Sequence, residues 1–575
     1  MTSRRRFVAS ALAAGAALPA AALPAPLDPH RVRAGAPPEA ARLGGTRDEV
    51  TVEDLAHAEA VQGLLFRPEQ REMMLDDVNE RLDDLAAIRE AEPPNSVPLA
   101  LVLDLGLSGE ARPAPGVRAQ VPMPTASGRP SDDRDLAFAS IPQLGAMLRA
   151  GTVTCVELAE LFLARLERFD PQLQAVVTLT SERALAQARR LDAELAAGTD
   201  RGPLHGIPWG AKDLLAVAGY PTTWGAEPYR EQAFDADAEV VRRLDAAGAV
   251  LVAKLTLGAL AWGDVWFGGM TKNPWNVDEG SSGSSAGPGS AVAAGLVPFA
   301  IGSETLGSII SPSTRNGVTG LRPTFGRVPT DGAMALSWSM DKLGPMARSA
   351  TDCALVLDAI RGAVPEADPA FPYDPTASVA DLRVGVLQTA FDEADGDGAE
   401  ADRATLDVLR RLGVDLQPVE VPDGIPVGPL GMILEAEAAA AFDGLTRSGG
   451  VDRMVRQERN AWPNVFRHAR FIPAVDYINA NRIRTQLMRA MADLMTEIDV
   501  LVAPSFAQTL LITNLTGHPA VVLPNALLPV EGHPDRRSPR SITFMGPLWK
   551  DHLPLHLAHA VQDETDVHRR RPPVS

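Results

Sequence analysis

The segment from Ser282 to Ser308 constrains the fold of this chain more than any other. It opens with a loop of Ser, Gly and Ala residues, passes through the apolar run Val297–Ile301, and closes in a second turn, Gly302–Ser308. Serine-glycine clusters usually form loops, but this one adjoins a run that favours a buried strand. The turn at Thr305–Ser308 can also direct successive backbone N–H groups into one concavity, which suits an oxyanion.

Lys212 is the second feature that points to chemistry. Only five of the 54 basic residues are lysine, and the other 49 are arginine. Lysine can lose its proton when burial lowers its pKa, whereas a guanidinium stays charged. Lys212 lies in the apolar, glycine-flanked segment Gly206–Leu215, where desolvation favours the neutral amine, a competent general base. Lys254, at the end of an apolar strand, is the nearest competitor, with a second interpretation in which its amine extends to solvent.

Together these motifs resemble the signature of the amidase signature family, G-G-S-S-G-G-S followed by G-T-D-T-G-G-S-I. The matching segments here are Ser282–Pro288 and Gly302–Ile309. The first serine of the pair, Ser284, and the last serine, Ser308, are 24 positions apart, as the family pattern requires. The similarity runs from Leu136 to the C-terminus and is thin between about 365 and 495. Two further similar elements are Gly317–Gly326 and Gly344–Ser349.

The resemblance implies a Ser-Ser-Lys triad that needs no metal or cofactor. Ser308 corresponds to the nucleophile, Ser284 to a bridging serine on a cis peptide bond, and Lys212 to the base. The implied reaction is hydrolysis of a carboxamide C–N bond to a carboxylate and ammonia or an amine, through an acyl-enzyme. The expected partner is a small-molecule amide substrate. The backbone N–H groups expected to form the oxyanion hole are those of Thr305, Leu306, Gly307 and Ser308.

The chain departs from the family pattern near the expected nucleophile. Leu306 replaces a glycine in the oxyanion turn, which is tolerable if this residue keeps a negative φ. Ile310 stands where the family usually has arginine, and Glu304 replaces aspartate. If those two family residues pair, the pair is broken here, and we expect Arg315 to be the substitute partner of Glu304.

Two other functions fit parts of the same sequence. Gly283–Gly287 matches G-x-S-x-G, the nucleophile elbow of α/β-hydrolase-type esterases, with Ser285 as nucleophile. An elbow should follow an apolar strand, yet the preceding residues, Asn276–Ser282, are polar. The other alternative is a catalytically inactive binding or assembly subunit on the amidase fold, against which the complete triad argues.

Apolar runs that alternate with helical patterns predict an α/β fold of the amidase signature type. We expect a large, mixed, mostly parallel central sheet covered by helices on both faces, plus an N-terminal helical extension. The helices expected in the first part of the main domain span residues 142–150, 155–169 and 181–197. The expected strands are Gly248–Ala253, Val297–Ile301, Val384–Leu387, Val414–Val421, Val500–Ala503 and Ala520–Leu523.

The N-terminal region predicts export. Ser3-Arg4-Arg5-Arg6-Phe7 precedes a short uncharged run, which is the layout of a twin-arginine signal peptide. We therefore expect the protein in the periplasm or secreted. The predicted divisions are a signal peptide at 1–25, a linker at 26–49, a helical extension at 50–94, a Pro/Gly-rich linker at 95–135 and an amidase domain at 136–575.

Composition excludes several partners. A net charge of −19 argues against nucleic-acid binding, which favours a basic surface. After the predicted signal, no apolar run approaches the roughly 18 residues of a membrane span, so no stable membrane anchor is expected. Cys155 and Cys353 are predicted to be buried thiols, with a disulfide left open. The three histidines near the C-terminus favour a packed helix over a metal site, and we expect a monomer or a homodimer.

Overall fold

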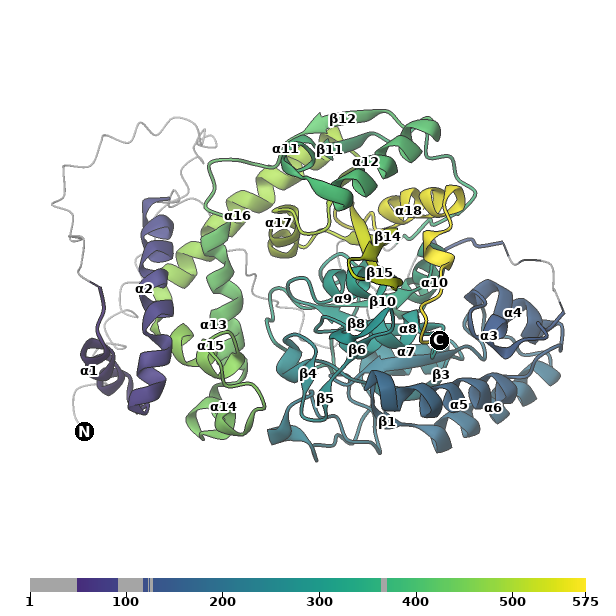
Figure 1. The fold of residues 1–575 in the computed structure, drawn as a ribbon, viewed down its shortest axis with the longest axis horizontal. Helices are drawn as coiled ribbons and strands as arrows, with labels where there is room; N and C mark the ends of the chain where they lie inside the picture. Colours follow the sequence, from purple (N-terminus) through teal and green to yellow (C-terminus); the bar gives the residue numbers. More distant parts are fainter. Residues whose placement is uncertain (1–48, 92–116, 123, 125–127, 363–369) are drawn as a thin grey trace, which may run out of the picture. The chain divides into compact units, whose positions relative to one another are not determined.

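The computed structural model describes residues 49–91, 117–122, 124, 128–362 and 370–575 (Figure 1). The predicted signal peptide at 1–25 lies outside the described residues, as does the linker at 26–49 apart from Glu49. Much of the linker predicted at 95–135 also lies outside them. Its last residues belong to a short helix, α3 (Asp133–Ala137).

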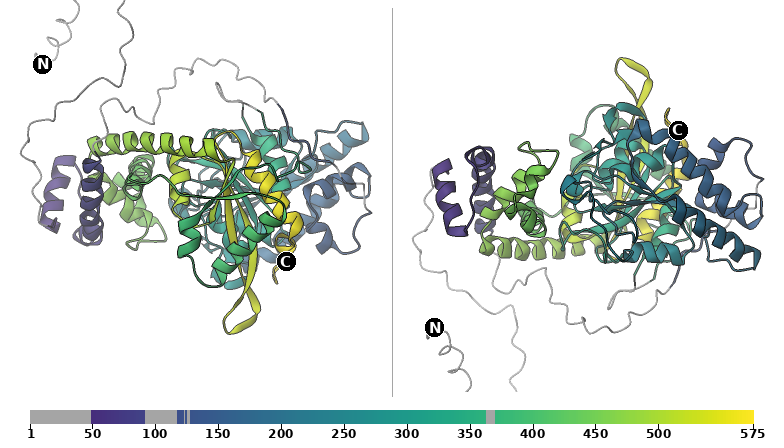
Figure 2. Two further views of the ribbon diagram at one scale, coloured as in Figure 1. Left: turned by 90° about the horizontal axis from the view of Figure 1, so that it is seen from above. Right: turned by 90° about the horizontal axis from the view of Figure 1, so that it is seen from below.

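An 11-stranded sheet forms the centre of the described chain, in the order β1-β3-β2-β8-β10-β9-β14-β15-β13-β11-β12. Helices cover both of its faces, and the β14–β15 hairpin extends beyond it (Figure 2). The strands are β1 (Val176–Leu179), β2 (Pro208–Lys212), β3 (Val250–Leu255), β8 (Phe299–Glu304), β9 (Thr319–Arg322), β10 (Lys342–Ala347), β11 (Val384–Leu387), β12 (Leu416–Val419), β13 (Val500–Pro504), β14 (Ala520–Val530) and β15 (His533–Met545).

The α/β class and the mixed sheet confirm the prediction, but parallel pairs are the minority. Strand β2 pairs in parallel with β3 and β8, and β11 pairs in parallel with β12 and β13. The other six neighbouring pairs are antiparallel. This corrects the expectation of a mostly parallel sheet. The physical reason lies in the middle of the sheet, where β14 and β15 are joined by a short turn, and strands joined in that way must run antiparallel.

The predicted elements of the main domain form close to their expected positions. The three helices are α4 (Ile141–Arg149), α5 (Cys155–Leu173) and α6 (Ser181–Ala196), and Thr154 begins α5 with a capping box. Strands β2, β3 and β11 are buried along their whole length, as continuous apolar runs favour. Both cysteines are free and buried, which confirms the prediction of two buried thiols.

Two N-terminal helices belong to the same unit as the sheet, Val50–Ser575. Helix α1 (Val52–Gln62) begins with a capping box on Thr51, and α2 (Pro68–Glu90) begins with proline in its first turn. Helix α2 packs against α15 (Trp462–His468) and α16 (Ala474–Glu497). Within the described part of the chain, no helix combines the length and apolar character needed to span a membrane.

Candidate active site

Strand pairing brings Lys212 to the turn that follows β8. Strands β2 and β8 are parallel neighbours, with Trp209 opposite Phe299 and Ala211 opposite Ile301. The carboxyl ends of parallel strands meet at one edge of a sheet, which is where α/β proteins gather their functional groups. Lys212 is the last residue of β2, so its side chain lies beside the Gly302–Ser308 turn.

The Lys212 amine is fully buried among serine hydroxyls. Its Nζ donates to Ser284 Oγ at 2.8 Å, to Ser285 Oγ at 3.0 Å and to Ser303 Oγ at 2.8 Å. Burial lowers the pKa of Lys212 well below its usual value, although the negative charges of Asp341 and Glu304 oppose that effect. The site therefore favours a neutral amine beside three hydroxyls, which is the form that can accept a proton.

The loop that carries Ser284 has an unusual backbone. The Gly283–Ser284 peptide bond is cis, as the family resemblance implied. Gly283 is required by close approach, because a Cβ atom there would lie 1.9 Å from the Gly263 carbonyl oxygen. The carboxylate of Asp264 accepts a hydrogen bond from the Ser282 N–H at 2.9 Å and holds the entry to the loop. These contacts fix the backbone that presents Ser284 to Lys212.

Ser284 and Ser308 line the same cavity, which has a volume of about 510 Å³. Thr305, Leu306 and Gly307 line it too, so the structure brings both predicted serines and the predicted oxyanion turn together. Gly307 has a φ of 79°, whereas Leu306 is not among the residues with positive φ. The replacement of the family glycine by Leu306 is therefore tolerated by the backbone of the turn. Among the described residues, none accepts a hydrogen bond from the N–H of Leu306, Gly307 or Ser308. These donors remain available to a ligand.

Glu304 lies directly behind the turn and holds its backbone. It accepts hydrogen bonds from the Ile309 N–H at 2.8 Å and the Ile310 N–H at 3.0 Å. Its ionic partner is Arg322 on β9, at 2.8 Å, with both side chains fully buried. Burial alone would raise the pKa of Glu304, but the Arg322 guanidinium and these hydrogen bonds lower it to about 2.

The expectation that Arg315 pairs with Glu304 is therefore wrong. Arg315 instead forms an ion pair with Glu279 at 2.9 Å, and about half of each side chain is exposed. Arg315 lies in the last turn of α9 (Ile310–Asn316), where its long side chain reaches solvent. Arg322 is placed by the sheet next to the carboxylate, and a buried carboxylate needs a buried partner.

Lys254, the competing lysine, has a structural role. Its amine is fully buried and lies 2.7 Å from the carboxylate of Asp213, which is equally buried. It also donates to the Pro221 carbonyl at 2.6 Å. The interpretation in which Lys254 extends to solvent is therefore wrong. This ion pair fixes the chain just after Lys212.

Ser285 is bound to its surroundings in a way that opposes the esterase alternative. Its hydroxyl donates to the Ser303 carbonyl at 3.1 Å and accepts from the Ser303 N–H at 3.1 Å, besides accepting from Lys212. Ser285 does not line the catalytic cavity. The preceding strand, β7 (Asn276–Gly280), belongs to a separate two-stranded sheet, so the strand-turn-helix context of a nucleophile elbow is absent from this part of the described chain.

Two residues at the site do not stand out in the sequence. Ser303 Oγ contacts Lys212, and its motif position before Glu304 is the only sequence signal for it. Asp341 is half-buried and accepts a hydrogen bond from the Thr305 hydroxyl at 2.6 Å, which holds the start of the oxyanion turn. The only pattern around Asp341 is a chance S-x-x-K match at residues 339–342.

In the described ranges, no cluster of three or more His, Cys, Asp or Glu side chains is arranged to hold a metal ion.

Comparison with known proteins assigns the family. The amidase family model matches residues 157–513, more than half of the chain. The chain is 34% identical over 480 residues to one component of the glutamyl-tRNA(Gln) amidotransferase from Roseiflexus sp. (strain RS-1), covering 74% of this chain and 96% of the relative. The crystal structure of a peptide amidase from Stenotrophomonas maltophilia is similar with a TM-score of 0.64 and 30% identity, covering 76% of this chain and 98% of that one.

The fold and these similarities define an amide-hydrolysing enzyme of the α/β class. The chain belongs to the amidase signature family.

Proposed function

We propose that this enzyme hydrolyses a carboxamide C–N bond through the triad Ser308, Ser284 and Lys212. The observation that carries the proposal is the contact between Lys212 Nζ and Ser284 Oγ, at the wall of the cavity that Ser308 also lines. Burial lowers the pKa of the amine and so favours its neutral form, which has a lone pair for the proton of Ser284. The reaction needs no group that this chain does not supply, apart from water.

The proposed steps follow from these positions. Ser284 passes its proton to Lys212 and takes the proton of Ser308, while Ser308 Oγ bonds to the substrate carbonyl carbon. The carbonyl oxygen becomes an oxyanion and accepts hydrogen bonds from the N–H groups of Leu306, Gly307 and Ser308. The C–N bond then breaks as Ser284 delivers a proton to the leaving nitrogen and takes back the proton held by Lys212. Water attacks the ester carbon and gives one proton to Lys212 through Ser284, and Ser308 leaves and receives that proton back through Ser284.

The relatives suggest different amides. The Roseiflexus protein is named for an amidotransferase of glutamyl-tRNA(Gln), and the Stenotrophomonas protein is named a peptide amidase. We favour small amides for this chain, because its net charge of −19 opposes binding of a polyanionic tRNA. Apolar side chains in the cavity wall, among them Met340, Leu434 and Trp462, favour an acyl group with apolar surface.

The test is a screen of ammonia or amine release over a panel of aliphatic, aryl and peptide amides. We expect the unmodified protein to hydrolyse at least one class, and Ser308→Ala to hydrolyse none. Ser311→Ala is the matched control, since Ser311 lines the same cavity and, among the described residues, its hydroxyl bonds only to Ser282, at 2.7 Å. Equal activity in Ser308→Ala and the unmodified protein contradicts the proposal. Complete inactivity of the unmodified protein on every amide favours the inactive binding subunit.

Export stays a prediction that the described residues do not address. We propose that the protein acts in the periplasm or outside the cell, because the segment Ser3–Phe7 resembles a twin-arginine signal. Replacing Arg4 and Arg5 together with lysine should retain the protein in the cytoplasm, as measured by cell fractionation. Equal export of the Arg4→Lys, Arg5→Lys variant and the unmodified chain contradicts this.

A further inference from the structure

Glu435 is an unusual member of the catalytic cavity wall. It comes from α13 (Met432–Ala441), and of the described residues that line the cavity it is the only one with an ionisable side chain. The wall otherwise consists of the serine loops and of apolar side chains such as Met340, Trp462 and Leu510. A carboxylate in such surroundings is costly unless it has a partner, so its presence calls for an explanation.

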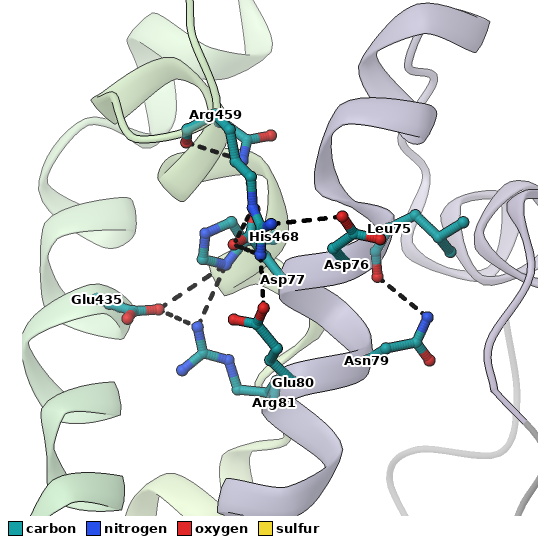
Figure 3. Close-up of polar contacts among 10 residues, drawn as sticks. Leu75, Asp76, Asp77, Asn79, Glu80, Arg81, Glu435, Arg459 and His468 are labelled. Atoms are coloured by element: carbon teal, nitrogen blue, oxygen red, sulfur yellow. Dashed lines mark hydrogen bonds and ion pairs between the residues drawn. The ribbon is translucent and has the colours of Figure 1, made fainter.

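One carboxylate oxygen of Glu435 is held by the N-terminal helix α2 (Figure 3). Arg81 on α2 donates to Glu435 Oε2, and the side chain of Arg81 is only 8% exposed. The same guanidinium lies 3.3 Å from His468 Nδ1 on α15. Burial lowers the pKa of His468 to about 4, so this imidazole is neutral and accepts the hydrogen bond. Arg81 thereby fixes the direction of the Glu435 carboxylate.

The second oxygen of Glu435 is available. No described residue donates a hydrogen bond to Oε1, and 29% of the Glu435 side chain is exposed. Acidic residues outnumber basic ones behind this wall, and Arg459 contacts three of them, at 2.8 to 3.4 Å. The charged and titratable groups around Glu435 are Asp76, Asp77, Glu80, Arg81 and Asp84 on α2, Arg459, and His468 on α15.

We propose that Glu435 selects amides that carry an ammonium group away from the scissile bond, and that Arg81 of the N-terminal helices positions it for this task. The proposal rests on the proposed function of the same cavity. An ammonium N–H would pair with the free Oε1 in low-dielectric surroundings, where such a contact is strong. A substrate carboxylate at that point would be repelled, so the residue works by exclusion as well as by attraction.

The ammonium group has two possible sources, the acyl part of the amide or the leaving amine. One arm of the test compares ω-aminohexanamide with heptanamide, which places a methyl group where the ammonium would be. The other arm compares N-(ω-aminopentyl)acetamide with N-hexylacetamide in the same way. In at least one arm, we expect kcat/KM of the ammonium substrate to exceed that of its methyl analogue by about tenfold.

The variants separate selection from folding. Glu435→Gln should lower the ammonium-to-methyl ratio of kcat/KM about tenfold, chiefly through KM. The double variant Arg81→Gln, Glu435→Gln removes both charges and should show the same loss without leaving a buried guanidinium unpaired. Glu160→Gln is the matched control, since Glu160 is an exposed carboxylate on α5 that does not line the cavity, and it should keep the unmodified ratio.

The pH dependence of the ammonium-to-methyl ratio tests the positioning role of Arg81 separately. Burial raises the pKa of Glu435 above its usual value, and the Arg81 guanidinium opposes that rise. Without Arg81 the carboxylate takes up a proton at higher pH, so Arg81→Gln should lose the ammonium preference at higher pH than the unmodified enzyme, and Arg81→Lys should restore it. A merely structural Arg81 would leave the pH dependence of the ratio unchanged.

The outcomes are distinguishable from those of the proposed function. If the methyl analogues are hydrolysed but the ammonium-to-methyl ratio is near one in both arms, this inference is wrong and the proposed function stands. If Glu435→Gln keeps a high ratio, the inference is equally wrong. If no amide in either arm or in the wider panel is hydrolysed, both the proposed function and this inference fail.

Discussion

Lys212 donates a hydrogen bond of 2.8 Å to Ser284, although 72 residues separate them in the chain. The contact depends on the parallel pairing of β2 and β8, which places Lys212 at the same sheet edge as the serine loops. The same position buries the amine away from water, and this burial lowers its pKa. The strand pairing therefore determines both where the amine lies and which protonation state is favoured.

The first prediction concerns the pH dependence of activity. Lys212 accepts a proton only as the neutral amine, and burial lowers its pKa well below the usual value. We therefore expect kcat/KM to fall as the pH drops through that lowered pKa. Lys212→Arg, which stays charged, should lose about a thousandfold in kcat/KM. A pH–rate profile with no acidic limb, or an active Lys212→Arg, contradicts the assignment.

The second prediction concerns stability. The pKa of Lys212 is lower in the folded chain than in the unfolded chain, so the unfolded chain binds the extra proton between the two values. Stability therefore rises with pH across that window and is lost as pH falls toward the folded value. Lys212→Met removes this dependence and should raise Tm at neutral pH while abolishing activity. Parallel curves of Tm against pH for the two proteins would show that the amine is not desolvated.

The third prediction separates Ser285 from the catalytic serines. Ser285→Ala removes one donor and one acceptor that satisfy the backbone of Ser303, and should lower the free energy of unfolding by about 1–3 kcal/mol. Activity should fall because Lys212 loses one of its three hydroxyl contacts, but it should persist. Kinetics and urea denaturation measure the two effects. Total loss of turnover in a folded Ser285→Ala would revive the esterase alternative.

The fourth prediction compares two arginines near the turn. Arg322→Met leaves the carboxylate of Glu304 buried without its cation and should lower the free energy of unfolding by about 3–5 kcal/mol. Arg315→Met breaks an exposed pair with Glu279 and should cost no more than about 1 kcal/mol. Urea denaturation of both variants measures the difference. Equal losses would mean that Arg322 is not the partner on which Glu304 depends.

The candidate site was readable from the sequence where its chemistry lies within short motifs. Ser284 and Ser308 share one motif pair, and Lys212 stands out because this chain otherwise uses arginine. The partner of Glu304 was not readable. Arg315 is nearer in the chain, but only the pairing of β9 with β10 and of β10 with β8 places Arg322 behind the turn.

The fold shows the same division between local and long-range information. Apolar runs such as β11 (Val384–Leu387) matched their predicted bounds because a buried strand needs little else. Strand β15 (His533–Met545) was missed, since its arginines and prolines do not resemble a strand. It is formed by pairing with β14 and β13, and that pairing makes the sheet more antiparallel than expected. The contact of Arg81 with Glu435 spans 354 residues and carried no sequence signal.

The most direct test of the proposed triad is covalent labelling with a serine-directed fluorophosphonate, followed by peptide mapping of the attached group. We expect one labelled residue, Ser308, with labelling slowed in Ser284→Ala and Lys212→Ala because the proton relay is broken. We further expect no labelling of Ser308→Ala. Attachment to Ser285, or no attachment to the folded, unmodified protein at any serine, would contradict the proposed triad.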